Sequence, residues 1–337
     1  MDEYKKVDIL AIGDIAINIF IKIKDAESKC DINGDHCKLC VDYGGKIPYE
    51  SANICYAVGN SSNVAVSASR LGVSSALITN MGNDQNGIEC LNVLDNENVD
   101  INFIKKESNK PTNCHYVLWY EKERTILVKH EKYDYEWIKT KRLEDYSSPS
   151  WLYLSSLGED SLYFHGEIIN YLKSHPKIKL VFQPGTFQIR FGIDALKDIY
   201  KRTNVFLCNH DEAKRILKTE ENDIAKLLKM IYELGPKIVV ITDGEDGSYA
   251  YDGMDAFFMK AFKQTTIEST GAGDAFSSAF VVALSLGKKI SEALMWGSAN
   301  AASVVSFVGP HKGLLTREQL ENYIKNAPID FEPINII

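Results

Sequence analysis

The sequence lacks features that would direct it to a membrane or to nucleic acid. No apolar run approaches the roughly 18 residues of a membrane-spanning helix, and the N-terminus, MDEYKKVDILAIGD, has no signal-peptide architecture. Lys and Arg form no block, and 38 of them against 46 Asp and Glu give a formal net charge of -8. Because nucleic-acid affinity comes largely from neutralising phosphates, we expect a cytoplasmic protein with no membrane or nucleic-acid partner.

Two common nucleotide-binding motifs are also absent. The chain has no G-x-x-x-x-G-K-[ST] loop, which excludes the usual P-loop, and no strand-linked G-x-G-x-x-G near its N-terminus supports a dinucleotide fold. It has no low-complexity tract, Pro-rich linker or internal repeat either. With nothing to mark a domain boundary, we predict a single domain over residues 1–337, interrupted by insertions.

Cysteine is present in an odd number, seven, and its spacing does not form a disulfide framework for a chain of this size. We therefore expect free thiols. Cys30, His36, Cys37 and Cys40 are close together, and such a cluster can hold zinc. Structural zinc at Cys30, Cys37 and Cys40 is not favoured, because a second well-spaced ligand pair is missing and Cys also serves as small apolar filler.

Short apolar segments alternate with helix-like segments along most of the chain. The predicted strands are Val7–Ile12, Ser75–Thr79, Trp151–Leu154, Leu180–Phe182, Asn204–Leu207 and Ile238–Ile241. Asn63–Leu71 and Asp211–Leu217 are examples of the predicted helices. Buried strands that alternate with helices indicate an α/β fold whose mainly parallel sheet is covered on both faces.

Two insertions interrupt this alternation, at about residues 19–57 and 112–130. The first is polar and longer than an ordinary βα loop. The second contains Asn113–Lys129, which alternates around the charged turn Glu121-Lys122-Glu123 and predicts a β-hairpin. We expect the two insertions to form a small second sheet that acts as a lid.

The segment from Glu268 to Phe276 (ESTGAGDAF) is the strongest functional signal, since a small-residue helix follows it. The backbone N–H groups of Gly271–Gly273 can approach an anion at the N-terminus of that helix. Asp274 would lie beside this anion hole and could accept a proton from an attacking hydroxyl. On these residues alone, a tight turn with Asp274 as a helix cap is the alternative.

Five elements in order make the sequence resemble the ribokinase-like, PfkB-type carbohydrate kinase family. They are VGNSSN at 58–63, GNDQNG at 82–87, NHDE at 209–212, TDGEDG at 242–247 and the segment from Thr270 to Ala279. The resemblance covers essentially the whole chain. It implies a ribokinase-like three-layer α/β/α fold with a β-sheet lid, and a kinase that uses ATP and Mg²⁺.

The resemblance also implies roles for individual residues. Asp274 would be the catalytic base, with Gly271, Ala272 and Gly273 forming the anion hole. Asn209 and Glu212 would organise Mg²⁺ through water, although a helix N-cap with a capping-box Glu fits the same spacing. The implied nucleotide-binding positions are Asn209, Thr242, Gly244, Gly247, Gly273 and Asn300. For Asn300, a packing contact is the alternative.

Acceptor binding is implied for Asn18, Gly59, Asn60 and Asn63 together with Asp274, because Asn side chains can both donate to and accept from hydroxyls. The three positions 59, 60 and 63 also fit turn and N-cap chemistry. Asn18 departs from the family pattern, which usually has an acidic residue there, and Val58 replaces a glycine.

Glu268 is a further departure, since the family usually has Asp at this position and often binds a monovalent cation beside it. The longer side chain could reach the same K⁺ ion or form an internal salt bridge instead. In the hairpin, Tyr116, Trp119, Tyr120 and Arg124 could contact a base, a sugar or a phosphate; cross-strand packing or a dimer contact is the alternative. The resemblance implies a homodimer formed through the lid.

These observations predict an ATP-dependent kinase that phosphorylates a hydroxyl of a small sugar. A nucleoside kinase of the same family, acting on adenosine, inosine, guanosine or cytidine, is the alternative. A non-catalytic sugar or nucleotide sensor is the rival from another class, and the intact Gly271–Asp274 segment argues against it. A sugar-phosphate acceptor would need several cations, and only Lys46 and Arg124 are candidates.

Overall fold

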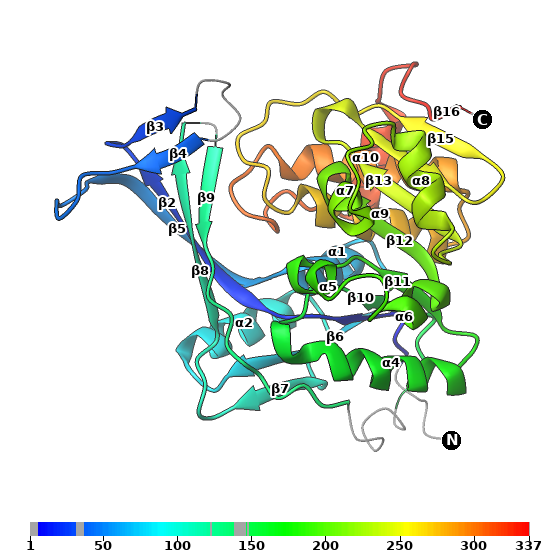
Figure 1. The fold of residues 1–337 in the computed structure, drawn as a ribbon, viewed down its shortest axis with the longest axis horizontal. Helices are drawn as coiled ribbons and strands as arrows, with labels where there is room; N and C mark the ends of the chain where they lie inside the picture. Colours follow the sequence, from blue (N-terminus) through cyan, green and yellow to red (C-terminus); the bar gives the residue numbers. More distant parts are fainter. Residues whose placement is uncertain (1–5, 32–36, 122, 138–145, 147, 337) are drawn as a thin grey trace.

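The computed structural model describes the chain apart from residues 1–5, 32–36, 122, 138–145, 147 and 337. In this described part, the largest sheet has the strand order β16-β15-β14-β13-β12-β11-β10-β1-β6-β7 (Figure 1). Its strands are β1 Ile9–Ile12, β6 Ser75–Gly82, β7 Ile104–Glu107, β10 Trp151–Leu154, β11 Lys179–Phe182, β12 Thr203–Asn209, β13 Ile238–Thr242, β14 Ser248–Tyr251, β15 Ala256–Met259 and β16 Ile334–Asn335. The pairs from β7 to β13 are parallel, and β14 to β16 extend the sheet in antiparallel fashion.

The predicted mainly parallel sheet is confirmed, because all six predicted strands lie in its parallel part as β1, β6 and β10 to β13. Side chains of these strands alternate between two hydrophobic cores. In β1, Ile9 and Ala11 belong to one core, whereas Leu10 and Ile12 belong to the other. Both faces of the strand are therefore buried, which explains why it has no polar alternation in the sequence.

Helices cover both faces and produce the expected three layers. Residues of α1, α2, α9, α10 and α11 join one core, and residues of α4, α6, α7 and α8 join the other. The helices are α1 Asn60–Arg70, α2 Gln85–Asn96, α4 Leu162–Ser174, α5 Thr186–Phe191, α6 Lys197–Arg202, α7 His210–Leu217, α8 Ile224–Tyr232, α9 Ala272–Ser285, α10 Ile290–Val304 and α11 Arg317–Lys325, with 3-10 turns η1 Glu159–Ser161 and η2 Gly244–Asp246. No helix of the described segments is long and apolar enough to cross a membrane.

A second sheet stands apart from the first, on the left of Figure 1, and is the expected small second sheet, which we call the lid. Its strand order is β5-β2-β8-β9, and a separate pair, β3-β4, lies beside it. The bounds are β2 Ala16–Ile23, β3 Glu27–Cys30, β4 Cys37–Cys40, β5 Tyr49–Val58, β8 Asn113–Tyr120 and β9 Glu123–Leu127. The predicted hairpin is confirmed by the antiparallel pairing of β8 with β9, and both predicted insertions contribute strands.

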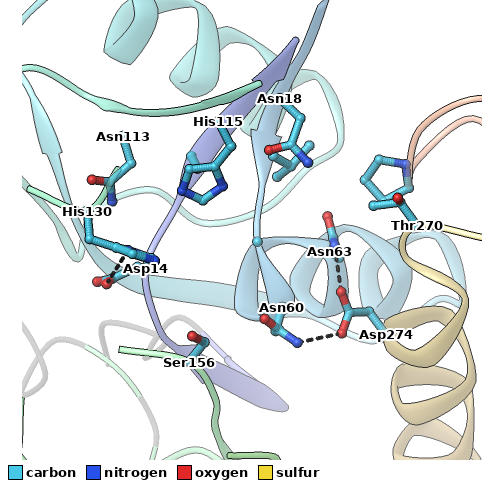
Figure 2. A pocket seen from close by; sticks show the side chains of 14 residues that line it. Asp14, Asn18, Asn60, Asn63, Asn113, His115, His130, Ser156, Thr270 and Asp274 are labelled. Atoms are coloured by element: carbon cyan, nitrogen blue, oxygen red, sulfur yellow. Dashed lines mark hydrogen bonds and ion pairs between the residues drawn. The ribbon is translucent and has the colours of Figure 1, made fainter. Parts of the chain in front are cut away.

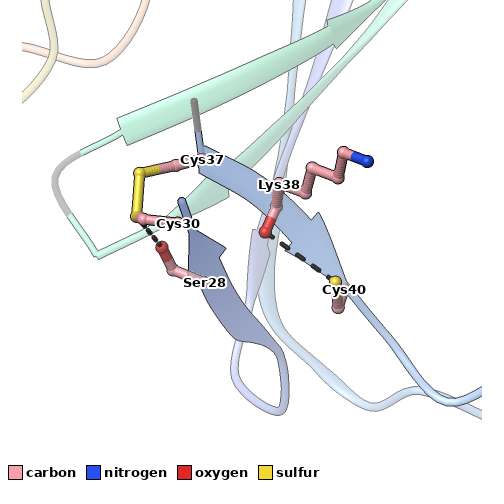
Figure 3. The surroundings of a disulfide bond; sticks show 5 residues. All are labelled: Ser28, Cys30, Cys37, Lys38 and Cys40. Atoms are coloured by element: carbon pink, nitrogen blue, oxygen red, sulfur yellow. Dashed lines mark hydrogen bonds between the residues drawn. A yellow bond between two sulfur atoms is a disulfide. The ribbon is translucent and has the colours of Figure 1, made fainter. Parts of the chain in front are cut away.

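One cysteine prediction was wrong: Cys30 and Cys37 form a disulfide, so these two thiols are not free (Figure 3). The cause is the register of the β3-β4 pair, which places the two residues directly opposite each other. Cys40 at the end of β4 is a free thiol. His36, the remaining member of the cluster, lies outside the described residues.

The carboxyl ends of the parallel strands bring polar residues to one edge of the large sheet. Asp14 follows β1 closely, Gln183 follows β11 directly, and Asn209 and Thr242 are the last residues of β12 and β13. In open α/β sheets, ligands bind outside these carboxyl ends. The fold therefore assembles a candidate site from segments that are far apart in the sequence.

Candidate active site

Asp274 lies in the first turn of α9, where its backbone position is set by a glycine. Gly271 is the N-cap residue and adopts a left-handed conformation with φ of 85°. A Cβ at this position would lie 2.4 Å from the Cβ of Pro310, so only glycine fits the turn without displacing a neighbour. The turn leaves the first backbone N–H groups of α9 without partners inside the helix, beside the carboxylate.

Three side-chain amides hold the Asp274 carboxylate. Asn60 Nδ2 donates to Oδ1 at 2.9 Å and Asn63 Nδ2 donates to Oδ2 at 2.7 Å (Figure 2). Gln183 Nε2 donates to Oδ1 at 3.1 Å. Burial raises the pKa of Asp274 above its ordinary value, and the three amide donors oppose that rise. Since Oδ1 accepts two of these bonds and Oδ2 accepts one, Oδ2 has the greater remaining capacity to accept a proton donor.

A second layer of residues orients these amides. His311 Nε2 lies 2.9 Å from Asn63 Oδ1, and burial lowers the pKa of His311 to about 4. The imidazole is therefore neutral near pH 7, and its Nε2–H donates to Asn63. The Tyr153 hydroxyl donates in the same way to Gln183 Oε1. Both contacts leave the amide N–H₂ groups facing Asp274.

Next to Asp274 is a cavity of about 180 Å³ that we call the acceptor cavity. The predicted acceptor residues Asn18, Gly59, Asn60 and Asn63 all line it. Its full lining is Asp14, Ala16, Asn18, Val58, Gly59, Asn60, Asn63, Asn113, His115, His130, Ser156, Thr270, Asp274 and Pro310. Residues of β2, β5 and β8 contribute to this lining, so the lid forms one wall.

Sequence reasoning missed several residues of the acceptor cavity, above all Asp14, His115 and His130. Asp14 is buried, and the Tyr135 hydroxyl lies 2.9 and 2.8 Å from its two carboxylate oxygens. Burial raises the pKa of Asp14 to about 7. Burial also lowers the pKa of His115 to about 4 and that of His130 below its ordinary value, so both imidazoles are neutral near pH 7.

A larger cavity of about 650 Å³ lies on the other side of the Thr270–Asp274 segment, and we call it the nucleotide cavity. Thr270 and Asp274 line the acceptor cavity, whereas Ala272 and Gly273 line the larger one. The predicted nucleotide positions Thr242, Gly244, Gly247 and Gly273 all line it. Its remaining lining residues are Glu245, Ser248, Lys260, Ala261, Phe262, Lys263, Gln264, Thr266, Ser269, Ala272, Phe276, Ser298, Ala301, Ala302 and Val305.

Two predicted nucleotide positions do not line this cavity. Asn300 is fully buried, donates to Ser67 and to the backbone oxygen of Ala275, and accepts from the Leu315 N–H. It therefore ties α10 to α1 and α9, which is the packing alternative. Asn209 lies at the carboxyl end of β12, outside the lining of the cavity.

Asn209 and Glu212 form a capping box at the start of α7. Asn209 Oδ1 accepts from the Glu212 N–H at 2.8 Å, and Glu212 Oε2 accepts from the Asn209 N–H at 3.0 Å. Burial raises the pKa of Glu212, and the negative charge of Asp274 adds to this rise. No group of three metal-ligating side chains occurs in the part of the chain that the structure describes.

Glu268 forms the internal salt bridge that its length allows. Arg124 Nη1 from the lid strand β9 lies 3.4 Å from Glu268 Oε1, and Arg124 also donates to Ser269 Oγ. The Thr270 N–H donates to the same carboxylate oxygen at 2.7 Å. The lid is thereby connected to the segment that carries the predicted anion hole.

The hairpin aromatics do not reach either cavity. Tyr116, Trp119 and Tyr120 are absent from both linings. The Trp119 indole donates to the Glu121 backbone oxygen at 3.0 Å, and Lys22 lies over its ring. Tyr116 is exposed. Trp119 therefore packs against a residue of the neighbouring strand, whereas Tyr116 lies on the solvent-exposed surface of the lid.

Comparison with known proteins agrees with this geometry. The sequence model described as pfkB family carbohydrate kinase matches residues 31–317. A 5-dehydro-2-deoxygluconokinase from Clostridium beijerinckii is 26% identical over 352 residues, covering 98% of this chain and 96% of the relative. An ATP-dependent 6-phosphofructokinase from Thermoanaerobacterium thermosaccharolyticum is 22% identical over 329 residues, covering 90% of each chain.

Solved structures show the same fold at low sequence identity. A ribokinase from Arabidopsis thaliana complexed with ribose and ATP superposes with a TM-score of 0.79 at 19% identity, covering 95% of this chain and 99% of the other. A nucleoside kinase from Methanocaldococcus jannaschii superposes with a TM-score of 0.73 at 19% identity, covering 96% and 99%. These likenesses establish the ribokinase-like architecture of the large sheet and the lid.

Proposed function

Since this chain belongs to the pfkB family of carbohydrate kinases, we propose that it transfers the γ-phosphoryl group of ATP to a hydroxyl of a small sugar. The observation that carries the proposal is the place of Asp274. Its carboxylate lines the acceptor cavity, while Ala272 and Gly273 of the same turn line the nucleotide cavity. A base and an anion hole at the junction of two cavities suit direct transfer between two bound substrates.

In the proposed reaction, the acceptor hydroxyl hydrogen-bonds to Asp274 Oδ2, which accepts only one bond from the protein side chains around it. The hydroxyl proton moves to this oxygen as the hydroxyl oxygen bonds to the γ-phosphorus. The bond between that phosphorus and the bridging oxygen of ADP breaks, and ADP leaves with the electron pair. The backbone N–H groups of Gly271 and Gly273 stabilise the charge on the phosphoryl oxygens during transfer. The Ala272 N–H, which donates to the Ser269 backbone oxygen at 3.2 Å, joins them by exchanging that bond.

The nucleotide cavity supports ATP as the phosphoryl donor. Thr242, Gly244 and Gly247 lie along its wall, and they suit the phosphates and ribose because bare backbone can approach them closely. The cavity also has apolar surface for the adenine ring of ATP, from Phe276, Ala301, Ala302 and Val305. A kinase that consumes ATP works where ATP is made, which supports a cytoplasmic location.

The residues present fit a hydrated Mg²⁺ held mainly by nucleotide phosphates. Asn209 and Glu212 would hold it through water, and the mutual repulsion of Glu212 and Asp274 favours a cation near them. When bound, the ion supplies charge neutralisation on the phosphates. The salt bridge between Arg124 and Glu268 supplies a positive charge beside the anion hole, so K⁺ dependence is not part of the proposal.

A sugar is favoured over a nucleoside by the size of the acceptor cavity. Its volume of about 180 Å³ is below the roughly 300–1,000 Å³ of typical pockets for larger ligands. The lid aromatics that could have sandwiched a base lie outside it. A non-catalytic sensor has no need of a carboxylate held by three amides at the junction of two cavities.

The lid also suits assembly into a homodimer. Ile54, Tyr116 and Leu127 expose large apolar side chains on one face of its strands. Adjacent exposed apolar residues on a sheet are typical of an interface. We include a homodimer through this surface in the proposal, and sedimentation velocity over a range of concentrations measures it. A protein that stays monomeric at all concentrations refutes it.

A coupled ADP-release screen tests the function, with ribose, fructose, other hexoses, adenosine, inosine, guanosine and cytidine as acceptors. We expect a sugar to give the highest turnover and the variant Asp274→Asn to reduce it by about 10²–10⁴-fold, because general base catalysis is lost. Asp95→Asn, an exposed carboxylate on α2, is the matched control.

Three results would contradict this proposal. ADP release that no acceptor stimulates argues against a kinase of these compounds. A nucleoside that is turned over well above every sugar supports the alternative acceptor class. Turnover by Asp274→Asn at the wild-type rate removes the general base from the mechanism.

A further inference from the structure

Three buried polar atoms of the acceptor cavity have no hydrogen-bond partner among the described residues. They are Asn18 Oδ1 on β2, His115 Nε2 on β8 and His130 Nδ1 on the segment after β9. Buried polar atoms are nearly always paired in folded proteins. Since all three line one cavity, a ligand bound there would supply the missing partners.

The chemistry of these atoms identifies the groups that fit them. Asn18 Oδ1 can only accept a hydrogen bond. Each neutral imidazole offers one donor nitrogen and one acceptor nitrogen, according to its tautomer. A hydroxyl group can donate to Asn18 Oδ1. It can also donate to an acceptor nitrogen of an imidazole or accept from a donor nitrogen. A carboxylate or phosphate can only accept, so it cannot satisfy Asn18.

The charges around the cavity point in the same direction. Among its lining residues, the formally charged side chains are the carboxylates of Asp14 and Asp274, with no Lys or Arg. Figure 2 shows Asp14 and His130 on the side of the cavity opposite Asp274, His115 above them, and Asn18 between His115 and Asp274 in this view. His130 Nδ1 lies 4.0 Å from Asp14 Oδ2. Asp14 is ionised above its raised pKa of about 7. At mildly alkaline pH an anionic group at this end would therefore face a carboxylate and meet no permanent cation.

We propose that the end of the acceptor cavity formed by Asp14, His115, His130 and Asn18 selects an uncharged polyhydroxyl sugar and rejects sugar acids and sugar phosphates. This inference rests on the proposed function. The hydroxyls remote from the site of transfer pair with these four residues, and that pairing leaves another hydroxyl beside Asp274. The same residues thereby determine which hydroxyl is phosphorylated.

The proposal separates this chain from the relatives that match it over nearly their whole length. Their names refer to an acid, 5-dehydro-2-deoxygluconate, and to a sugar phosphate, fructose 6-phosphate. An acceptor carboxylate or phosphate group remote from the reacting hydroxyl would lie toward Asp14. Like charges brought together without solvent oppose binding strongly. We therefore expect this chain to prefer neutral acceptors over the anionic acceptors in the names of these relatives.

Steady-state kinetics with matched acceptors tests the proposal. The pairs are glucose with gluconate and fructose with fructose 6-phosphate, and 5-dehydro-2-deoxygluconate is tested as well. We expect the best neutral sugar to exceed every anionic acceptor in kcat/KM by at least about 100-fold. In His130→Phe, we expect KM for that sugar to rise about tenfold or more, while KM for ATP stays unchanged.

Asp14→Asn tests the charge separately, because it keeps the size of the side chain. We expect this variant to narrow the preference for neutral over anionic acceptors. His175→Phe, at the C-terminal end of α4 and outside both cavity linings, is the matched control for His130→Phe and should leave all kinetic constants unchanged. Thermal unfolding of each variant distinguishes a lost contact from a lost fold.

The outcomes separate this inference from the proposed function. Preference for an anionic acceptor overturns the inference and leaves the kinase activity standing. An unchanged sugar KM in a folded His130→Phe also overturns it. If no acceptor is phosphorylated, the proposed function fails. Thermal stabilisation of the wild-type protein by each acceptor then tests the selective cavity on its own. Stabilisation by neutral sugars supports the selective cavity, whereas stabilisation by acids alone, or by no acceptor, refutes it.

Discussion

Replacing Gln183 by Leu should move the acidic limb of the pH dependence of catalysis toward higher pH. Gln183 Nε2 is one of three amide donors that stabilise the ionised form of Asp274, and it lies 3.1 Å from Oδ1. Burial already raises the pKa of Asp274, and this amide opposes the rise. Removing the donor therefore raises the pKa further, and the base is protonated and inactive over a wider acidic range.

The size of the shift follows from the strength of one hydrogen bond to a charged group. Such a bond contributes roughly 1.5–3 kcal/mol, and one pKa unit corresponds to about 1.4 kcal/mol. We therefore expect the acidic limb of the kcat/KM profile to move upward by about 1–2 pH units. Activity well above this limb should change little, because Asp274 is ionised there in both proteins.

The assay is ADP release at subsaturating acceptor, measured from acidic to alkaline pH at constant ionic strength. Tyr153→Phe is the matched control, since it removes the hydroxyl that orients Gln183 and keeps the amide itself. A smaller shift in the same direction is expected for it. An acidic limb that does not move in a folded Gln183→Leu would refute the assignment of that limb to Asp274.

Two further substitutions test the loop and its contact with the lid. Gly271→Ala should lower both the free energy of unfolding and kcat, because φ at this position is 85° and the new Cβ meets Pro310. Gly287→Ala is the control, since its φ is 79° but the space around it is open. It should lose only the stability that the strained backbone costs, about 1–2 kcal/mol. Equal effects of the two in unfolding and turnover measurements would contradict this. Arg124→Ala should lower the free energy of unfolding by roughly 1–3 kcal/mol, because the buried Glu268 carboxylate loses its cation. Denaturation in urea measures the change, and Arg124→Lys should recover part of it; stability unaffected by Arg124→Ala would show that the salt bridge contributes nothing.

The large sheet was predictable because its parallel strands are buried on both faces. Such strands appear in a sequence as short uninterrupted apolar segments, and Trp151–Leu154 was predicted with its observed bounds. The antiparallel extension by β14, β15 and β16 was not predicted. β16 has only two residues, both exposed, and so has no apolar pattern. β14 and β15 are as long as β10, and sequence reasoning missed them.

The turn that carries the proposed anion hole and base was predictable because its sequence signal is local. Gly271, Gly273 and Asp274 are neighbours in the chain, and their spacing alone predicts a turn at a helix N-terminus. Gln183 directly follows a predicted strand, a position at the carboxyl edge that could have revealed it. His311 had no such signal, because its contact with Asn63 joins residues 248 positions apart.

By itself, the sequence determined the parallel sheet, the lid hairpin and the Gly271–Asp274 turn, because each depends on residues that are close together in the chain. Only the tertiary structure decided which side chains line the two cavities. The packing of the lid against the large sheet places Asp14, His115 and His130 in one cavity. Asn300 is instead buried in the core between helices. The tertiary structure also paired Cys30 with Cys37, since strand register is set by interactions between strands and not by the count of cysteines.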